Sequence, residues 1–339
     1  MRNPFAKLAA CLVASTSLVM LPTVATAADT KPINVVASFS ILADMVHQVG
    51  ADNVMVTSLV GPDEDAHVFD PSPADAKALA QADIVVINGL GFEGWIDRLV
   101  KSSGFKGKLV VATNGIKPIK IEQAGHKHDH GKHEDEKHSH AKHDHDKHKH
   151  KHKHKHDHQH HDHGDVDPHA WQDLGNAKIY VKNIRDALIQ VRPAVATDIN
   201  LRAQQYIGEI DALNQKTKTR LAQIPRKDRR VIASHGAFAY FGQAYGVDFF
   251  SLQGWTTERE PSAADVARVI REIKHDKVRA LFVENMSDPR LLQRVSEETG
   301  VKIGGELYSD ALSAPGTATD TYLKMFAYNA DLIWMTLQR

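Results

Sequence analysis

Cysteine is almost absent from this sequence of 339 residues, and the single Cys11 lies in an apolar run near the N-terminus. Arg2 and Lys7 form a positive region before this run. After the run, Ala25-Thr26-Ala27 has the small-residue pattern of a cleavage site. Residues 1–27 are therefore predicted to be a signal peptide. Cleavage there leaves no cysteine, which excludes disulfides, Cys₄ zinc sites and cysteine nucleophiles from the exported protein.

Two other interpretations of the N-terminal run remain open. A transmembrane anchor is disfavoured because the run is short and ends in small residues. A lipoprotein is suggested by Leu8-Ala9-Ala10-Cys11, which has the letters of a lipobox. However, most of the apolar residues follow Cys11, whereas a lipid-modified cysteine should end the apolar region.

The chain also lacks any excess of charge, because 42 lysines and arginines balance 42 aspartates and glutamates. A nucleic-acid-binding domain would show a basic excess, so this class is disfavoured. Hydrophobic residues make up 42% of the chain, which is enough for a packed core. The length suggests two domains or one large one.

Strand and helix patterns alternate along the chain, which predicts an α/β fold with parallel sheets covered by helices. Apolar, β-branched runs predict strands at residues 33–39, 54–60, 84–87, 109–112, 231–234, 247–252, 280–283 and 301–307. Helical spacing predicts helices at residues 41–49, 92–101 and 261–274. Another predicted helix is opened by Ser72 and Pro73. Further helices are predicted to end at residue 245 and to begin at residues 289 and 319.

A long segment between Pro193 and Pro225 separates the two halves. Its apolar residues recur at helical spacing, and a helix over residues 194–223 would be about 45 Å long. We therefore expect two α/β lobes, at residues 28–192 and 225–339, each with a parallel sheet flanked by helices. One long helix within residues 193–224 joins them.

Histidine is abundant, and 17 of the 22 histidines lie in residues 126–163, together with 9 lysines and 8 acidic residues. Such a segment cannot bury enough apolar surface to offset its chain entropy, so we expect a disordered loop within the first lobe. Its composition favours weak capture of several metal ions with little discrimination among them. A solubilising spacer is the alternative.

Five histidines lie outside this segment. His47 and His275 fall in predicted helices with polar neighbours and are expected on the surface. His67 and His235 follow predicted strands and His169 precedes a helix, and ligands collect beyond the carboxyl ends of strands in α/β sheets. Asp310 also follows a strand. Spacing alone does not show that these positions belong to one site. A single histidine in a loop is more often a hydrogen-bonded turn residue than a metal ligand.

Four short segments resemble the metal-ligand motifs of the cluster A-I solute-binding proteins, the extracytoplasmic receptors of zinc and manganese ABC importers. They are GPDEDAHVFDPSP at 61–73, DPHAW at 167–171, SHGAFAYF at 234–241 and YSDAL at 308–312. The resemblance runs in order from about residue 33 to the C-terminus and includes the long central helix.

This resemblance implies four metal ligands: His67, His169, His235 and Asp310. Manganese receptors of the family have a carboxylate at the third position, whereas zinc receptors have histidine, and imidazole suits zinc. A charged, His-rich loop before the second ligand is typical of the zinc branch, with its ZnuA and AztC types. The expected metal is therefore Zn²⁺, bound as the transported ligand.

The fourth ligand position is less firmly assigned than the three histidines. Asp310 occupies the matching position, while Glu64 and Asp65, on the loop that carries His67, or a water molecule are alternatives. Glu284, at the end of a predicted strand, is either a hydrogen-bond acceptor for a ligand histidine or a surface acid.

The resemblance implies a monomeric periplasmic receptor that hands zinc to a membrane permease and its ATPase, with a periplasmic metallochaperone as a further candidate partner. Four protein ligands leave no open metal position, and no H-E-x-x-H motif occurs, so an enzyme is not expected. The alternatives are a manganese receptor of the same family, a periplasmic zinc buffer without a transporter, and a zinc hydrolase.

Overall fold

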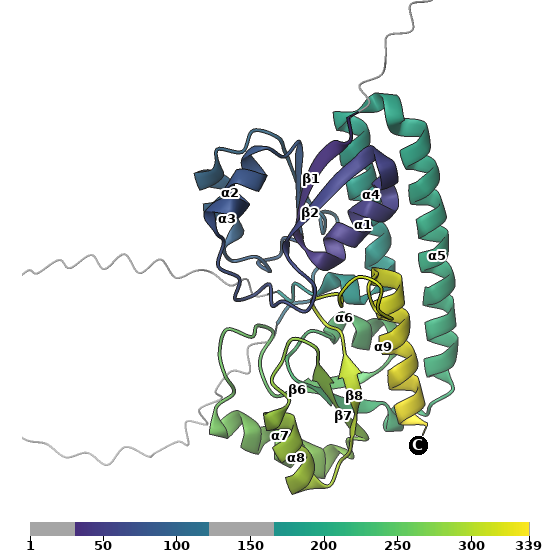
Figure 1. Ribbon diagram of the computed structural model, residues 1–339. Coiled ribbons are helices and arrows are strands. Elements are labelled where there is room, and N and C mark those ends of the chain that lie inside the picture. Colours follow the sequence, from purple (N-terminus) through teal and green to yellow (C-terminus); the bar gives the residue numbers. More distant parts are fainter. Residues whose placement is uncertain (1–30, 122–165, 339) are drawn as a thin grey trace, which may run out of the picture. The chain divides into compact units, whose positions relative to one another are not determined.

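Strands and helices alternate in the computed structural model, which describes residues 31–121 and 166–338 (Figure 1). The predicted signal peptide, residues 1–27, and the predicted His-rich loop, residues 126–163, lie outside the described residues. None of the helices within residues 31–121 and 166–338 has the length and apolar character needed to cross a membrane.

Two four-stranded parallel sheets form the framework. The first has the order β2-β1-β3-β4 and the second the order β6-β5-β7-β8, so both halves repeat one topology. The first sheet comprises β1 (Ile33–Phe39), β2 (Val54–Val60), β3 (Ile84–Ile87) and β4 (Lys108–Val111). The second comprises β5 (Arg230–Ala233), β6 (Asp248–Ser251), β7 (Ala280–Glu284) and β8 (Ile303–Leu307).

Helices flank both sheets, which confirms the predicted fold class of two α/β lobes. In the first lobe they are α1 (Ser40–Gly50), α2 (Pro73–Ala80), α3 (Ile96–Ser103) and α4 (Leu174–Val191). In the second lobe they are α6 (Ala239–Tyr245), α7 (Ala263–Asp276), α8 (Arg290–Thr299) and α9 (Tyr322–Leu337). The exact residue bounds of the lobes stay a prediction.

The long helix α5 (Ala196–Ala222) leads from the first lobe to the second, as expected. It packs against α1 and α4 of the first lobe and against α6 and α9 of the second (Figure 1). With 27 residues it spans about 40 Å. It starts two residues later than predicted, because Pro193–Val195 forms a separate 3₁₀ turn.

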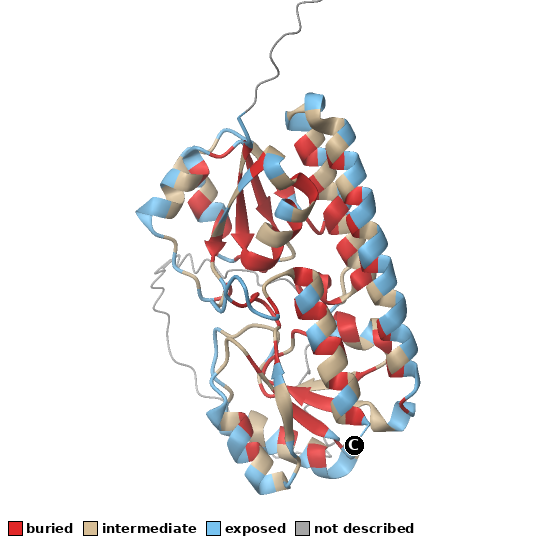
Figure 2. Cartoon of the chain, turned by 45° about the vertical axis from the view of Figure 1, so that its right-hand side comes forward, coloured by how far each residue is buried: buried red, intermediate tan, exposed pale blue. Residues whose placement is uncertain are grey.

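The cores lie where the strands meet the helices. The inner strands β1 and β3 are almost wholly buried, while exposed residues cover the outer faces of the helices (Figure 2). The main core includes the first sheet, α1, α4 and buried residues of α5, α6 and α9. A second, smaller core, with Ile232, Val269 and Leu292 among its members, joins the other face of the second sheet to α7 and α8.

Local capping explains where several helices begin. Ser72 caps α2 in a capping box with Asp75, and Ser262 caps α7 in the same way with Asp265. By contrast, α3 begins at Ile96 and not at residue 92 as predicted. The preceding turn is fixed by Glu93, whose carboxylate accepts hydrogen bonds from the backbone N–H groups of residues 88 and 89.

The two stems beside residues 122–165 lie next to each other. Lys120 and Val166 form an antiparallel bridge, and the backbone N–H of Asp167 donates to the carbonyl of Ile119 over 2.9 Å. The Tyr240 hydroxyl accepts from the N–H of Ile119 and donates to the carbonyl of Asp167. Tyr240 belongs to α6, so the second lobe fastens both stems.

Candidate metal centre

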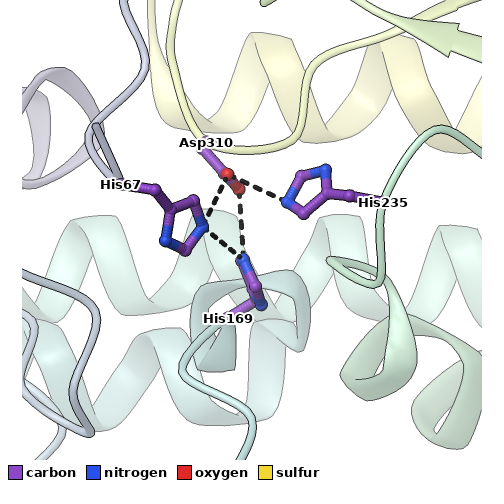
Figure 3. A group of neighbouring side chains, drawn as sticks. All are labelled: His67, His169, His235 and Asp310. Carbon is purple, nitrogen blue, oxygen red and sulfur yellow. Dashed lines mark hydrogen bonds and ion pairs between the residues drawn. The ribbon is translucent and has the colours of Figure 1, made fainter. Parts of the chain in front are cut away.

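Three histidines and one aspartate that are distant in the sequence meet between the two sheets (Figure 3). His67 follows β2, His235 follows β5 and Asp310 follows β8, while His169 precedes the 3₁₀ turn that leads into α4. One possible ligand atom from each of the four lies within 4.8 Å of all the others. The structure therefore brings together the four residues that the motif resemblance singled out.

The ring nitrogens and the carboxylate face one another at distances suited to a shared metal ion. Nε2 of His67 is 3.3 Å from Nε2 of His169 and 3.4 Å from Oδ2 of Asp310. Asp310 also lies 3.1 Å from Nε2 of His235 and 3.6 Å from Nε2 of His169. Zinc–nitrogen bonds of about 2.0–2.1 Å place tetrahedral ligands about 3.3 Å apart.

All four residues are buried, and the site contains polar atoms that the fold leaves unsatisfied. The exposed fraction is 7% for His67, 0% for His169, and 1% for both His235 and Asp310. Among the described residues, none forms a hydrogen bond of ordinary geometry with Nε2 of His235 or with either carboxylate oxygen of Asp310. Buried polar atoms normally have partners, so this donor set fits a cation.

Burial and charge act on the site in opposite directions. Burial alone would lower the pKa of His235, but the negative charges of Glu284 and Asp310 raise this pKa well above its usual value. Burial would raise the pKa of Asp310, but His235 and His169 hold that pKa well below its usual range. Burial lowers the pKa of His67. The carboxylate is thus kept ionised, as a metal ligand must be.

Each histidine of the cluster donates its backbone N–H to a neighbouring carboxylate. The acceptors are Asp65 for His67, Asp167 for His169 and Glu284 for His235, and each distance is 2.9 Å.

For two of the histidines the same carboxylate also reaches the imidazole ring. Oδ1 of Asp167 is 2.7 Å from Nδ1 of His169, and Oε2 of Glu284 is 2.5 Å from Nδ1 of His235. A carboxylate at Nδ1 fixes the ring orientation and leaves Nε2 free to bind a metal. Glu284 is therefore a partner of a site histidine and not a surface acid.

Sequence reasoning missed the role of Asp167, although a signal was present. The pattern Asp-x-His occurs twice, at Asp65–His67 and Asp167–His169, and both aspartates accept the N–H two residues later. This short turn aims the histidine side chain from a loop. A repeated local motif of this kind could have indicated both acids.

The alternative acids are engaged elsewhere. Oε2 of Glu64 accepts a hydrogen bond from the N–H of Gly61 over 2.7 Å, and Asp65 accepts from His67 and Thr257. Neither belongs to the four-residue group. His47 and His275 are exposed, as predicted.

Aromatic residues and loop contacts enclose the cluster. The rings of Phe92 and Trp171 pack against His67 and His169 at centroid distances of 4.8 and 5.3 Å. Trp171 and Gln172 donate from their side chains to the carbonyl of Ser309 over 2.9 and 2.8 Å. This carbonyl precedes Asp310, so residues next to His169 in the first lobe position the aspartate of the second.

Comparison with known proteins agrees with this arrangement. Residues 35–334 match the family described as ZnuA, zinc-uptake complex component A periplasmic. The chain belongs to this family. Its members are substrate-binding receptors of ABC importers and not enzymes, so the prediction that this chain is no enzyme is confirmed.

Curated relatives extend over almost the whole chain. The iron-binding protein YfeA of Yersinia pestis is 30% identical over 338 residues, which cover 98% of this chain and 97% of YfeA. The manganese-binding lipoprotein MntA of Halalkalibacterium halodurans is 28% identical over 306 residues, covering 90% of this chain and 89% of MntA. The metals in these names differ.

Solved structures share the fold. The periplasmic zinc binding protein TroA from Treponema pallidum has a TM-score of 0.76 and 25% sequence identity, covering 91% of this chain and 100% of TroA. A Mn-bound periplasmic metal binding protein from Candidatus Liberibacter asiaticus has a TM-score of 0.73 and 27% identity, with the same coverage. Both support the two-lobe architecture.

Proposed function

We propose that this protein is the zinc receptor of an ABC importer. It binds Zn²⁺ through His67, His169, His235 and Asp310 and delivers the ion to a membrane permease driven by an ATPase. The convergence of three imidazole nitrogens and one carboxylate in a buried site between the lobes carries this proposal.

The donor set favours zinc on chemical grounds. Imidazole suits zinc, whereas manganese prefers oxygen ligands, and three of the four side chains here offer nitrogen. Four protein ligands also complete a tetrahedral zinc shell and leave no open position for a reactive water. A binding-and-release mechanism follows, and a zinc hydrolase is disfavoured.

Manganese is the second candidate. Several curated relatives are named for manganese, and several related structures are titled as Mn-bound. Both carboxylate oxygens of Asp310 face the histidines, so this residue could supply two oxygens to a larger coordination shell. The metal preference is therefore the property to measure first.

Export to the periplasm is proposed from residues 1–27, with a lipid anchor at Cys11 as the competing interpretation, since several relatives are named as lipoproteins. Residues 126–163 are proposed to capture additional metal ions weakly. A monomeric receptor that works with a permease and an ATPase completes the proposal, with a periplasmic metallochaperone as a further candidate partner.

Competition titration with zinc and manganese tests the assignment. Deleting residues 126–163 removes 17 histidines that would obscure the result, and the adjacent stems at Lys120 and Val166 allow the ends to be joined. After the deletion we expect one tightly bound zinc ion per chain and loss of the additional, weakly bound zinc ions. Loss of all tight binding would contradict the proposed site.

His235→Glu tests the metal preference directly. A carboxylate in place of this imidazole makes the site harder, so zinc affinity should fall while manganese affinity rises or holds. His275→Glu is the matched control, because His275 is exposed and outside the cluster. An unchanged zinc-to-manganese ratio in His235→Glu would remove His235 from the ligand set.

Metal uptake by cells separates a receptor from a buffer. A strain without this protein should take up zinc poorly when zinc is limiting, and the wild-type chain should restore uptake. Normal uptake in the deletion strain would favour a periplasmic buffer without a transporter.

A further inference from the structure

The three acids that hold the cluster histidines do not act alike. Asp167 and Glu284 each contact both the backbone N–H and the ring of their own histidine. Asp65 accepts the N–H of His67 with Oδ1, but its Oδ2 accepts a hydrogen bond from the Thr257 hydroxyl over 2.6 Å. The support of His67 is thus completed by a residue outside its own loop.

This hydrogen bond joins the two lobes. Asp65 lies between β2 and α2 of the first lobe, whereas Thr257 lies between β6 and α7 of the second. Asp63 adds two further ties, since its N–H donates to the carbonyl of Leu312 and its carboxylate accepts from Asn285, both over 2.9 Å. Of these three ties, only the one through Asp65 ends on a side chain that also holds a cluster histidine, through its other carboxylate oxygen.

A cavity of about 270 Å³ reaches His67. Trp95 and Arg98 of the first lobe line it together with Glu258, the neighbour of Thr257 in the second lobe. His67 is also the most exposed of the four residues, at 7% against 1% or less for the others. A second cavity, of about 300 Å³, reaches His235. By exposed fraction, however, His67 is the cluster residue most accessible to solvent.

We propose that Thr257 is a positioning residue for His67 and that the Asp65–Thr257 hydrogen bond sets the rate of metal release. This inference depends on the proposed function, in which His67 binds the metal. When the bond opens, the loop loses the tie to the second lobe that lies nearest to His67 in the sequence, and His67 leaves first. His169 and His235 stay in place, because acids of their own lobes hold both backbone and ring.

Thr257→Val tests the inference, because it removes the donating hydroxyl and keeps the shape of the side chain. We expect zinc to dissociate about tenfold faster, the effect of losing a hydrogen bond to a carboxylate, while the association rate changes less than about twofold. Dissociation is measured by stopped flow into excess chromophoric chelator, on protein without residues 126–163. Thr257→Ser retains the hydroxyl and should restore the wild-type rate.

Matched control variants distinguish the positioning of His67 from a general loosening of the contacts between the lobes. Thr256→Val removes a hydroxyl that accepts the backbone N–H of Glu258 in its own loop, and it should leave the rate unchanged. Asn285→Ala breaks the other side-chain tie of the His67 loop and should have a clearly smaller effect than Thr257→Val. In a His67→Ala background, Thr257→Val should have no further effect, because the ligand it positions is gone.

Three results would overturn the inference: a wild-type rate in Thr257→Val, equal acceleration in Asn285→Ala, or an undiminished effect of Thr257→Val in the His67→Ala background. Failure of the proposed function looks different. In that case wild-type protein without residues 126–163 would bind no zinc tightly, and no dissociation rate could be measured for any variant.

Discussion

The two lobes have the same strand order but contribute to the site from different strands. The edge strand β2 leads to His67, whereas the equivalent edge strand β6 leads to Thr257. The inner strand β5 leads to His235, whereas the equivalent β1 leads to Ser40, whose hydroxyl accepts the N–H of Leu312. The shared topology provides equivalent places at the ends of the strands, and side-chain identity decides which of them join the four-residue cluster.

The edge strands on the other side of the two sheets, β4 and β8, differ from these, because the connections after both of them carry residues of the site. His169 lies in the connection between β4 and α4, and Asp310 lies in the connection between β8 and α9, so the connection after the last strand of each sheet supplies the site. Each lobe therefore supplies two of the four residues of the cluster. Each lobe also supplies one acid, Asp167 or Glu284, that orients a histidine of its own. Substitution of corresponding residues in one lobe at a time measures what each lobe contributes to metal binding and to stability.

Removal of a donor from either lobe should have the largest effect. We expect His169→Ala and His235→Ala each to weaken zinc binding more than about a hundredfold, the share of one ligand in the binding energy of a four-ligand site. Competition titration on protein without residues 126–163 measures this loss, with His275→Ala as control. A variant that keeps its zinc affinity within about threefold would show that its lobe does not supply that donor.

Acid should remove the stabilisation by zinc. Zinc at a hundredfold excess over its Kd adds about 2.7 kcal/mol to the free energy of unfolding. The raised pKa of His235 means that its protonated form stabilises the metal-free fold, fully below the ordinary value near 6.5 and less as pH rises through the folded pKa. Zinc must displace this proton to bind. The stabilisation by zinc therefore becomes smaller as the pH is lowered.

Melting temperatures of the metal-free and zinc forms check this expectation between pH 7.5 and 5. The two values should approach each other as pH falls. A constant difference over the whole interval would be inconsistent with a site built from three histidines.

Neutralising the orienting acids should have an intermediate effect. Glu284→Gln and Asp167→Asn keep the side-chain shape but remove the charge at Nδ1 of the bound histidine. We expect a loss of zinc affinity of roughly 10–100-fold for each. Glu272→Gln, on the partly exposed face of α7, is a control that should bind normally. Normal binding by both acid variants would make the two carboxylates structural features of the loops only.

The equivalent helix caps should give the smallest effect. Ser72→Ala and Ser262→Ala each remove a capping box at the helix after an edge strand, one in each lobe. Each should lower the free energy of unfolding by about 1 kcal/mol in urea denaturation, without changing zinc affinity more than about twofold. Two separate unfolding transitions in either variant would show that the lobes do not unfold as one cooperative unit.

Patterns local in the sequence predicted much of this fold. The strands appear at the expected places within a few residues, because their apolar runs are short and bounded by turn residues. The cap at Ser72 and the long helix α5 also follow from local signals. The start of α3 does not, because the side chain of Glu93 binds backbone groups upstream.

The site was predicted from motifs, and its long-range contacts were not. The four residues that the motif resemblance singled out do converge, although spacing alone would not have joined them. The sequence leaves two roles open for Glu284, and its 2.5 Å contact with His235 decides between them. Asp65 and Thr257 are 192 residues apart, and their contact depends on how the lobes pack, which no local pattern encodes.

The paired stems at Lys120 and Val166 have a consequence for how this receptor can diversify. Because the chain leaves and returns at one point, fastened by Tyr240, the intervening length hardly affects the framework. Closing a flexible loop costs only about 0.6 kcal/mol more for each doubling of its length. Insertions can therefore lengthen or shorten here over evolutionary time, and a reporter protein with neighbouring termini could be spliced into this position.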